Sequence, residues 1–211
     1  MADRVLPEFE RFLGTPLLIE AEQQEDTVYG ILPDFRLAYY NPAWVAFARA
    51  NGAAEKVWSG AYLGTSVLEV TADELQPFYR KLFRLALHQS VEELRPLQHR
   101  YFCHSAEMYR EFLMTLYQVG DAQGVLIVNS LVVEVEYDST KAVTVEGREP
   151  DYVDAAGLVH QCAHCRRVHD LKTNHWDWVP DWVRDMPPRT THTICNFCMA
   201  FFYPPAQGNG T

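Results

Sequence analysis

The chain has 211 residues, of which 48% are hydrophobic and 22% are charged, which is the composition of an ordinary globular protein. Its formal net charge of −10 at pH 7 would repel phosphate backbones, so we expect no nucleic-acid partner. No run of 18 apolar residues occurs and the first residues lack the apolar core of a signal peptide, so we expect no membrane span and a cytoplasmic location.

The first forty residues predict a short helix followed by a pair of strands. Residues 6–18 carry apolar side chains at helical spacing, namely Phe9, Phe12 and Leu13. The polar run at residues 20–26 predicts a linker. Residues 27–32 and 37–40 predict two strands, which a turn at residues 33–36 joins into a hairpin.

Two further helices are predicted after the hairpin. Asn41 is a favoured N-cap and Pro42 a favoured first helical residue, so we expect a helix that begins at Pro42 and stops at Asn51 and Gly52. Residues 73–89 predict the longest helix of the chain. Its apolar residues recur every three or four positions and define one buried face: Leu75, Phe78, Tyr79, Leu82, Leu85 and Ala86.

Three strands are predicted after the long helix, at residues 98–104, 110–119 and 124–135. A loop bounded by glycines joins the last two strands into a hairpin. The final strand is almost continuously apolar, which is typical of a central strand covered on both faces. A polar stretch at residues 136–150 then leads into a tail that contains most of the cysteines.

The tail contains two matched cysteine pairs, Cys162 with Cys165 and Cys195 with Cys198. Two residues between partners let both sulfurs of a tight turn reach one tetrahedral metal ion, and two such turns supply four thiolates. Four thiolates make a closed structural zinc site with no open position for a substrate. A tail of about fifty residues is too small to bury a sufficient core alone, so such a site would serve its folding.

Other interpretations of the tail remain open. A redox dithiol would explain one Cys-x-x-Cys pair, but not two. Four histidines are alternative ligands, which we expect beside the sulfurs or on the surface: His164, His169, His175 and His192. Arg166 and Arg167 either offset the negative charge of a four-thiolate centre or form a solvated basic turn. We expect the aromatic residues of the tail to form its small core and to pack it on the sheet: Trp176, Trp178, Trp182, Phe201, Phe202 and Tyr203.

The stretch DFRLAYYNPAW at residues 34–44 resembles the opening of a PAS domain, and the element order over residues 27–136 is similar to that family. The resemblance implies a five-stranded antiparallel sheet crossed by a long helix. The tail is similar to a segment that follows PAS domains in bacterial signalling proteins, with its Cys-x-x-Cys pairs, tryptophan-rich middle and Tyr203. The resemblance also implies a homodimer through the N-terminal helix, whose apolar residues have no partner in their own segment, and a signalling partner of unknown identity.

PAS-like domains often hold a ligand, haem or flavin between the sheet and the long helix. His88 would be the haem ligand, but at about 100° per residue it lies roughly 130° from the centre of the apolar face, so we expect a solvated histidine. Cys103 is expected to be a small buried residue and not a reactive thiol. The flavin photosensor motif built around Asn-Cys-Arg-Phe is absent. We therefore expect neither haem nor flavin, and cofactor-binding residues other than those for zinc stay unknown.

The sequence contains no G-x-x-x-x-G-K-[ST], G-x-S-x-G or H-E-x-x-H motif, so we expect no enzyme. The predicted fold is α+β, with a PAS-like five-stranded antiparallel sheet, flanking helices and a small zinc-stapled module. The predicted divisions are an N-terminal helix and linker (1–26), a PAS-like sensor domain (27–137), a linker (138–151), a four-cysteine zinc module (152–205) and a disordered tail (206–211).

The predicted function is non-catalytic signal sensing or protein interaction in a bacterial protein, with Zn²⁺ in a structural role. Two alternatives stay open. One is a PAS sensor that binds haem or a small ligand. The other is a redox- or zinc-responsive switch, in which the four-cysteine tail opens on oxidation.

Overall fold

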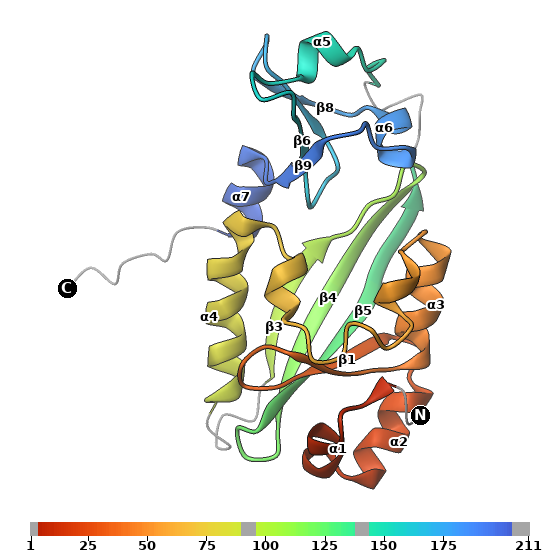
Figure 1. Cartoon of the computed structure of the whole chain (residues 1–211), viewed down its shortest axis with the longest axis vertical. Coiled ribbons are helices and arrows are strands. Elements are labelled where there is room, and N and C mark those ends of the chain that lie inside the picture. Colours follow the sequence, from red (N-terminus) through yellow and green to blue (C-terminus); the bar gives the residue numbers. More distant parts are fainter. Residues whose placement is uncertain (1–3, 90–95, 138–143, 204–211) are drawn as a thin grey trace, which may run out of the picture. The chain divides into compact units, whose positions relative to one another are not determined.

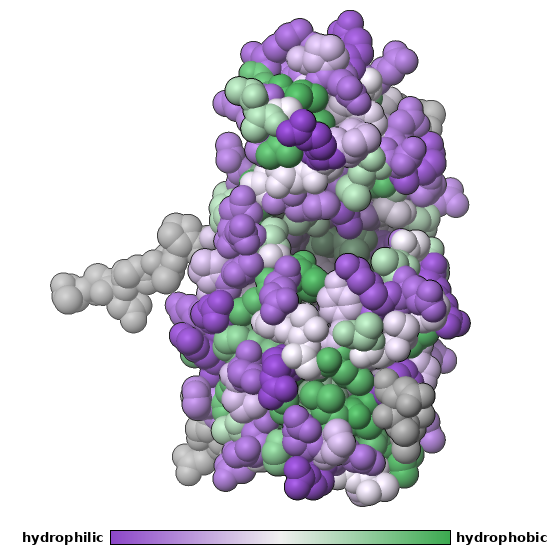
Figure 2. Space-filling view, in the orientation of Figure 1, coloured by the Kyte–Doolittle hydropathy of each residue, from purple (hydrophilic) through white to green (hydrophobic). Residues whose placement is uncertain are grey.

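The computed structural model describes residues 4–89, 96–137 and 144–203 (Figure 1). Contacts divide the described chain into two compact units: residues up to 71 with 76–99 and 112–131, and residues 72–75 with 100–111 and those from 132 onward. Among the described helices, none combines the length and the apolar character that crossing a bilayer requires. The face shown in Figure 2 mixes hydrophilic and apolar side chains.

Five strands form one sheet in the order β2-β1-β5-β4-β3. The strands are β1 (Thr27–Ile31), β2 (Leu37–Tyr40), β3 (Leu97–Phe102), β4 (Met108–Val119) and β5 (Gly124–Glu136). β1 pairs antiparallel with both β2 and β5. The expected α+β class, with a five-stranded antiparallel sheet and flanking helices, is therefore confirmed. Strands β3, β4 and β5 each contribute residues to both units.

Two short helices replace the single helix predicted near the N-terminus. Helix α1 (Pro7–Leu13) and helix α2 (Thr15–Gln23) are separated by Gly14, whose φ of 74° favours glycine. Helix α2 extends into the polar run predicted as a linker. Its buried residues Leu18 and Ala21 lie three positions apart and give it an apolar stripe that the polar composition obscured.

Phe9 fixes α1 on the sheet. Its ring lies against Gly30 of β1 and Gly124 of β5, where an added Cβ would come within 2.2 Å and 2.8 Å of ring atoms. Phe9 and Leu13 are buried in one core cluster with Tyr39. The apolar face of this helix therefore has partners within its own chain, which removes the reason for covering it with a second copy. The homodimer stays a prediction.

Asn41 ties three elements of the first unit together. It is fully buried, and its Oδ1 accepts hydrogen bonds from the N–H groups of Val28 at 3.0 Å and Trp44 at 2.9 Å. Its Nδ2 donates to three backbone oxygens: those of Ala21, Gln24 and Asp26. One side chain thus caps helix α3 (Pro42–Ala50) as predicted and also joins the end of α2 to β1.

The long helix predicted over residues 73–89 is a 3₁₀ turn at Asp73–Leu75 followed by helix α4 (Gln76–Leu87). The prediction of its buried face was wrong at Leu85, which is 52% exposed. The buried stripe passes through Phe83 and Leu87, which lie four positions apart. Leu85 lies two positions from each of them and therefore points to another side of the helix. His88 is exposed, as expected.

Strand β5 lies between β1 and β4, in the central position predicted for it. Val125 and Ile127 in its first half are fully buried. Its second half differs from the prediction of two covered faces, because three apolar residues there are exposed: Leu131, Val132 and Val135. The pairing with β1 reaches only as far as Asn129, so the apolar run continues past the part of β5 that pairs with β1.

The second unit contains a four-stranded sheet in the order β8-β7-β6-β9. Its elements are α5 (Glu149–Tyr152), β6 (Val159–Cys162), β7 (Val168–Asp170), β8 (His175–Asp177), α6 (Pro180–Arg184), β9 (Thr190–Thr193) and α7 (Asn196–Phe202). One core cluster gathers Tyr152, Val159, Val168 and Val179. The domain boundaries stay a prediction. Part of the predicted linker (138–143) and the predicted disordered tail (206–211) lie outside the described residues.

Candidate metal centre

The four cysteines of the tail come together in the second unit. Cys162, Cys165, Cys195 and Cys198 are all buried, and their sulfur atoms lie within 4.8 Å of one another. The sulfurs of Cys165 and Cys195 are 3.7 Å apart. A Zn–S bond of about 2.3 Å in a regular tetrahedron sets two sulfurs about 3.8 Å apart, so this spacing fits one such ion. The cluster could therefore hold a metal ion such as zinc.

Parallel pairing of two strands brings the cysteine pairs together. Strand β6 ends at Cys162, which lies opposite Thr193 at the end of β9. Cys195 follows two residues later as the N-cap of α7, and the first turn of that helix presents Cys198. The long segment between the two pairs forms β7, β8, α6 and β9. It therefore supplies the crossover that a parallel pair of strands requires.

Backbone N–H groups surround the sulfurs. The N–H of Cys195 donates to the Sγ of Cys162, and the N–H of Cys198 donates to the Sγ of Cys195, each at 3.4 Å. The N–H of Arg166 donates to the carbonyl of Cys162 at 3.0 Å and closes the first cysteine turn, in which Arg166 has a φ of 62°. The two hydrogen bonds from N–H groups to sulfur favour the ionised form of the thiols that accept them.

The four sulfurs cannot all be negatively charged without a cation. Hydrogen bonds from the other three cysteines lower the pKa of Cys162. Hydrogen bonds with Cys162 and Cys195, together with burial, raise the pKa values of Cys165 and Cys198. Like charges at this spacing repel, so the sulfurs share protons and do not ionise together. A divalent ion that prefers sulfur would replace those protons, and so the donor set fits Zn²⁺.

The two arginines after the first cysteine pair have different surroundings. Burial alone would lower the pKa of Arg167, but the charge and hydrogen bond of Cys165 outweigh it and raise that pKa. Arg167 is thus placed to offset negative charge at the sulfurs. The guanidinium of Arg166 instead lies 3.3 Å from Nε2 of His192.

His164 lies between the first two cysteines but does not join the sulfur cluster. Its Nδ1 accepts a hydrogen bond from the N–H of Phe102 at 3.3 Å, and its Nε2 donates to the Tyr203 hydroxyl at 2.5 Å. Its ring stacks on Phe202 with centroids 4.9 Å apart. Burial lowers the pKa of His164 to about 4, so the ring is neutral. With both nitrogens occupied, His164 connects the cysteine turn to β3 and α7.

The other candidate ligands also lie outside the cluster. His169 stacks on Trp176, and His175 is exposed. Cys103 is only partly buried and not the fully buried residue that was expected, but burial still raises its pKa, which disfavours a reactive thiolate. Within the described residues, the four cysteines are the only group of three or more histidine, cysteine or acidic side chains close enough to share a metal ion.

The predicted aromatic core of the tail is present in part. Three of its members make close ring contacts in the second unit: Trp178 with Tyr137, Trp182 with Tyr152, and Phe202 with Phe102. The prediction was wrong for Phe201, which is 66% exposed. Phe102 belongs to β3, so the expectation that aromatic residues would pack the tail on the sheet is confirmed for Phe202.

Sequence reasoning missed an aromatic stack beside the cysteine turns. The ring of His104 stacks on Phe102 and on Tyr109, and it meets Tyr137 edge-on. The only signal in the sequence is the alternation of Phe102 and His104, which places both side chains on one side of an extended chain. The contact with Tyr137 joins residues far apart in the sequence and left no local pattern.

Comparisons with known proteins do not assign a family. No protein-family model and no curated protein matches the chain. Among solved structures, the chain is similar to the Vibrio cholerae VqmA dimer without its target DNA, reported in a study of LuxR-type receptors. The match has 11% identity and a TM-score of 0.38, and it covers 64% of this chain and 56% of that chain. The chain thus spans little more than half the length of that protein, and a likeness at this level assigns neither fold nor function.

Proposed function

We propose that the chain is a non-catalytic signalling or protein-interaction protein, in which a PAS-like domain precedes a module folded around a structural zinc ion. The observation that carries the proposal is the buried cluster of Cys162, Cys165, Cys195 and Cys198. The five-stranded sheet, with helices α3 and α4 between β2 and β3, supports the PAS-like part, since the sequence resemblance implies a strand hairpin, helices and three further strands in one sheet.

A structural role for the metal follows from the donors. All four are protein sulfurs, so the tetrahedron is complete and no position remains for a substrate or a water molecule. Each cysteine is at most 2% exposed, which also closes the site to solvent. A bound ion would join β6 to α7 and so stabilise the second unit.

Metal analysis of protein purified without chelators tests the proposal. Native mass spectrometry should show about one zinc per chain, because four thiolates fill one tetrahedral site. The Cys162→Ser variant should lose most of this metal. The matched Cys103→Ser variant should keep it, since Cys103 lies outside the cluster. Metal-free wild-type protein would overturn the proposal.

A second candidate function, small-ligand sensing, is favoured by two indole groups of the first unit. The Nε1 atoms of Trp44 and Trp58 are buried and have no hydrogen-bond partner within the part of the chain that the structure describes. Both residues lie beside Tyr40, whose ring centroid is 6.2 Å from that of Trp44 and whose hydroxyl donates to the Trp58 carbonyl at 3.3 Å. Buried tryptophan N–H groups usually have an acceptor, and a small ligand would supply one.

Mass spectrometry also tests the second candidate. The native mass should exceed the denatured mass by zinc plus a small molecule, and Trp44→Phe and Trp58→Phe should each release that molecule while keeping the aromatic ring. A visible spectrum shows whether the molecule is haem. A native mass that is explained by zinc alone would contradict ligand sensing but would leave the structural-zinc proposal intact.

A further inference from the structure

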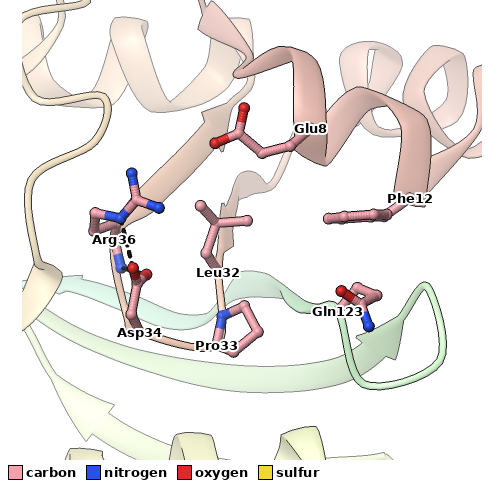
Figure 3. A pocket seen from close by; sticks show the side chains of 7 residues that line it. All are labelled: Glu8, Phe12, Leu32, Pro33, Asp34, Arg36 and Gln123. Carbon is pink, nitrogen blue, oxygen red and sulfur yellow. Dashed lines mark hydrogen bonds and ion pairs between the residues drawn. The ribbon is translucent and has the colours of Figure 1, made fainter.

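The first unit contains an open pocket of about 260 Å³, shown in Figure 3. Helix α1 contributes Glu8 and Phe12 to its wall. The turn between β1 and β2 contributes Leu32, Asp34 and Arg36, and the loop between β4 and β5 contributes Gln123. The volume lies just below the ~300–1,000 Å³ of pockets for drug-sized ligands, so the pocket suits a smaller molecule.

One end of the pocket presents the opposite charges of Glu8 and Arg36, which attract each other: the pKa of Arg36 is raised first by Asp34 and, to a smaller extent, by Glu8. The Nε of Arg36 donates to Asp34 at 2.6 Å, and the backbone N–H of Arg36 donates to the same carboxylate at 3.2 Å. This leaves the terminal nitrogens of Arg36 free for a ligand. Figure 3 shows the Glu8 carboxylate directed toward the guanidinium above Leu32. Among the described residues, neither the Glu8 carboxylate nor the terminal nitrogens of Arg36 have a hydrogen-bond partner.

The opposite end of the pocket is apolar and held in place. Phe12 is half-buried against the core cluster of the first unit, and its Cβ lies 2.7 Å from where a Cβ on Gly120 would stand. Leu32 is 4% exposed and forms the floor between the two ends. Ring and aliphatic surface here would cover an apolar side chain of a ligand.

The turn that carries the charged residues is fixed by its own contacts. The N–H of Leu32 donates to the carbonyl of Arg36 at 3.0 Å, and the N–H of Phe35 donates to the carbonyl of Leu32 at 2.8 Å. Phe35 is buried and packs against Phe83 with ring centroids 5.8 Å apart. The backbone that carries Arg36 is therefore fixed before any ligand arrives, which reduces the entropy lost on binding.

We propose that this pocket binds a free α-amino acid with an apolar side chain. The ammonium group of the ligand contacts Glu8, its carboxylate accepts two hydrogen bonds from the terminal nitrogens of Arg36, and its side chain lies against Phe12 and Leu32. Asp34 holds Arg36 in this orientation. A molecule that carries both charges next to an apolar body complements all of these groups at once. The site is separate from the sulfur cluster and does not depend on the proposed function.

Titration of the full-length protein with L-leucine, followed by amide NMR shifts, tests this inference. Saturable shifts should appear in residues 8–12 and 32–36. Glu8→Gln and Arg36→Gln should each weaken binding about tenfold or more, because each removes one charge-assisted contact. Glu10→Gln, on the same helix but outside the pocket lining, is the matched control and should bind as wild type does.

A second ligand separates the two charged contacts. Leucine amide has the ammonium group but no carboxylate, so it should bind wild type more weakly than leucine does. Its neutral carbonyl can still accept a hydrogen bond from Arg36 but carries no negative charge, so Arg36→Gln should weaken the binding of leucine amide less than it weakens the binding of leucine. The inference is overturned if leucine gives no saturable shift, if leucine binds Glu8→Gln as tightly as wild type, or if leucine amide binds wild type as tightly as leucine.

Discussion

The two compact units differ in the groups that their buried parts contain. In the first unit, one core cluster gathers buried residues from α1, α2, β1, β2 and β4, with Phe9 and Tyr39 fully buried. The second unit contains a smaller core cluster, made of Tyr152 and three valines, and also four buried sulfurs. Apolar burial suffices where several helices and strands meet. Where the elements are only three to seven residues long, a cross-link through a metal can supply what burial does not.

The largest expected effect is the unfolding of the second unit alone. Cys198→Ser would remove one ligand of the proposed zinc ion, and the apparent free energy of structural zinc binding is about 10 kcal/mol or more at neutral pH. Because that exceeds what short elements can supply by themselves, residues 152–203 should lose their protection from hydrogen exchange. Residues 4–89 should keep theirs, since their core contains none of the four sulfurs.

The control for this experiment is Cys103→Ser, which changes a cysteine of the same unit outside the cluster. It should leave the exchange pattern of both units unchanged. Equal loss of protection in both units of Cys198→Ser would show that they unfold together and would contradict the contrast between them.

The next largest expected effect is a loss of stability in the first unit. Asn41→Ala leaves the N–H groups of Val28 and Trp44 without their acceptor inside the protein. We expect the free energy of unfolding to fall by about 3 kcal/mol, since each unsatisfied buried group costs about 1–3 kcal/mol. Chemical denaturation measures the change. Asn51→Ala removes an exposed hydrogen bond to the carbonyl of Phe47 and should have an effect below about 1 kcal/mol.

A smaller effect tests how closely α1 approaches the sheet. Gly30→Ala places a Cβ about where the Phe9 ring now lies, so it should lower the free energy of unfolding by about 2 kcal/mol. In a Phe9→Leu background the same change should cost clearly less, because the ring no longer blocks the new methyl group. A double-mutant cycle measures this coupling, and strictly additive effects would mean that Phe9 does not lie on Gly30.

The smallest expected effect at neutral pH is on stability, through a buried histidine of the second unit. Burial, followed by the positive charge of Arg167, lowers the pKa of His104 to about 4. This lies below the unfolded value of about 6.5, so the stability contributed by the neutral ring is present above about pH 6.5 and is lost as the pH falls through about 4. An NMR titration, with His104→Asn to assign the signal, should find the ring neutral at about pH 5. A midpoint near the unfolded value would contradict its burial.

Local signals account for the elements that the sequence predicted well. The β1–β2 hairpin and the cap at Asn41 depend on residues within a few positions of one another, so pattern alone locates them. The exposure of Leu85 could not be predicted from the sequence. It depends on which side of α4 is buried, and that side is set by the contact of Phe83 with the distant Phe35. The limit of burial along β5 lies near Asn129, whose partner Thr27 is the first residue of β1, and this register is set only in the folded sheet.

The candidate metal centre also has features that short sequence patterns predict and features that they do not. Cys-x-x-Cys spacing identifies all four sulfurs, because each pair closes its own short turn. The contact between His164 and Phe102 joins residues 62 positions apart, and no short pattern encodes it. The parallel pairing of β6 with β9 is also invisible to sequence periodicity, although the gap between the cysteine pairs leaves room for it.

Because β6 pairs in parallel with β9, we expect closure of the sulfur cluster to be a late folding event. A turn such as the one at Cys162 and Cys165 closes over a few residues, whereas Cys195 can approach it only after β7, β8 and α6 have crossed over. Contacts between distant residues form more slowly than local ones. A thiophilic ion added during refolding would therefore meet two sulfurs first and four only at the end. The time course of tetrahedral coordination would then report how fast this part of the chain folds.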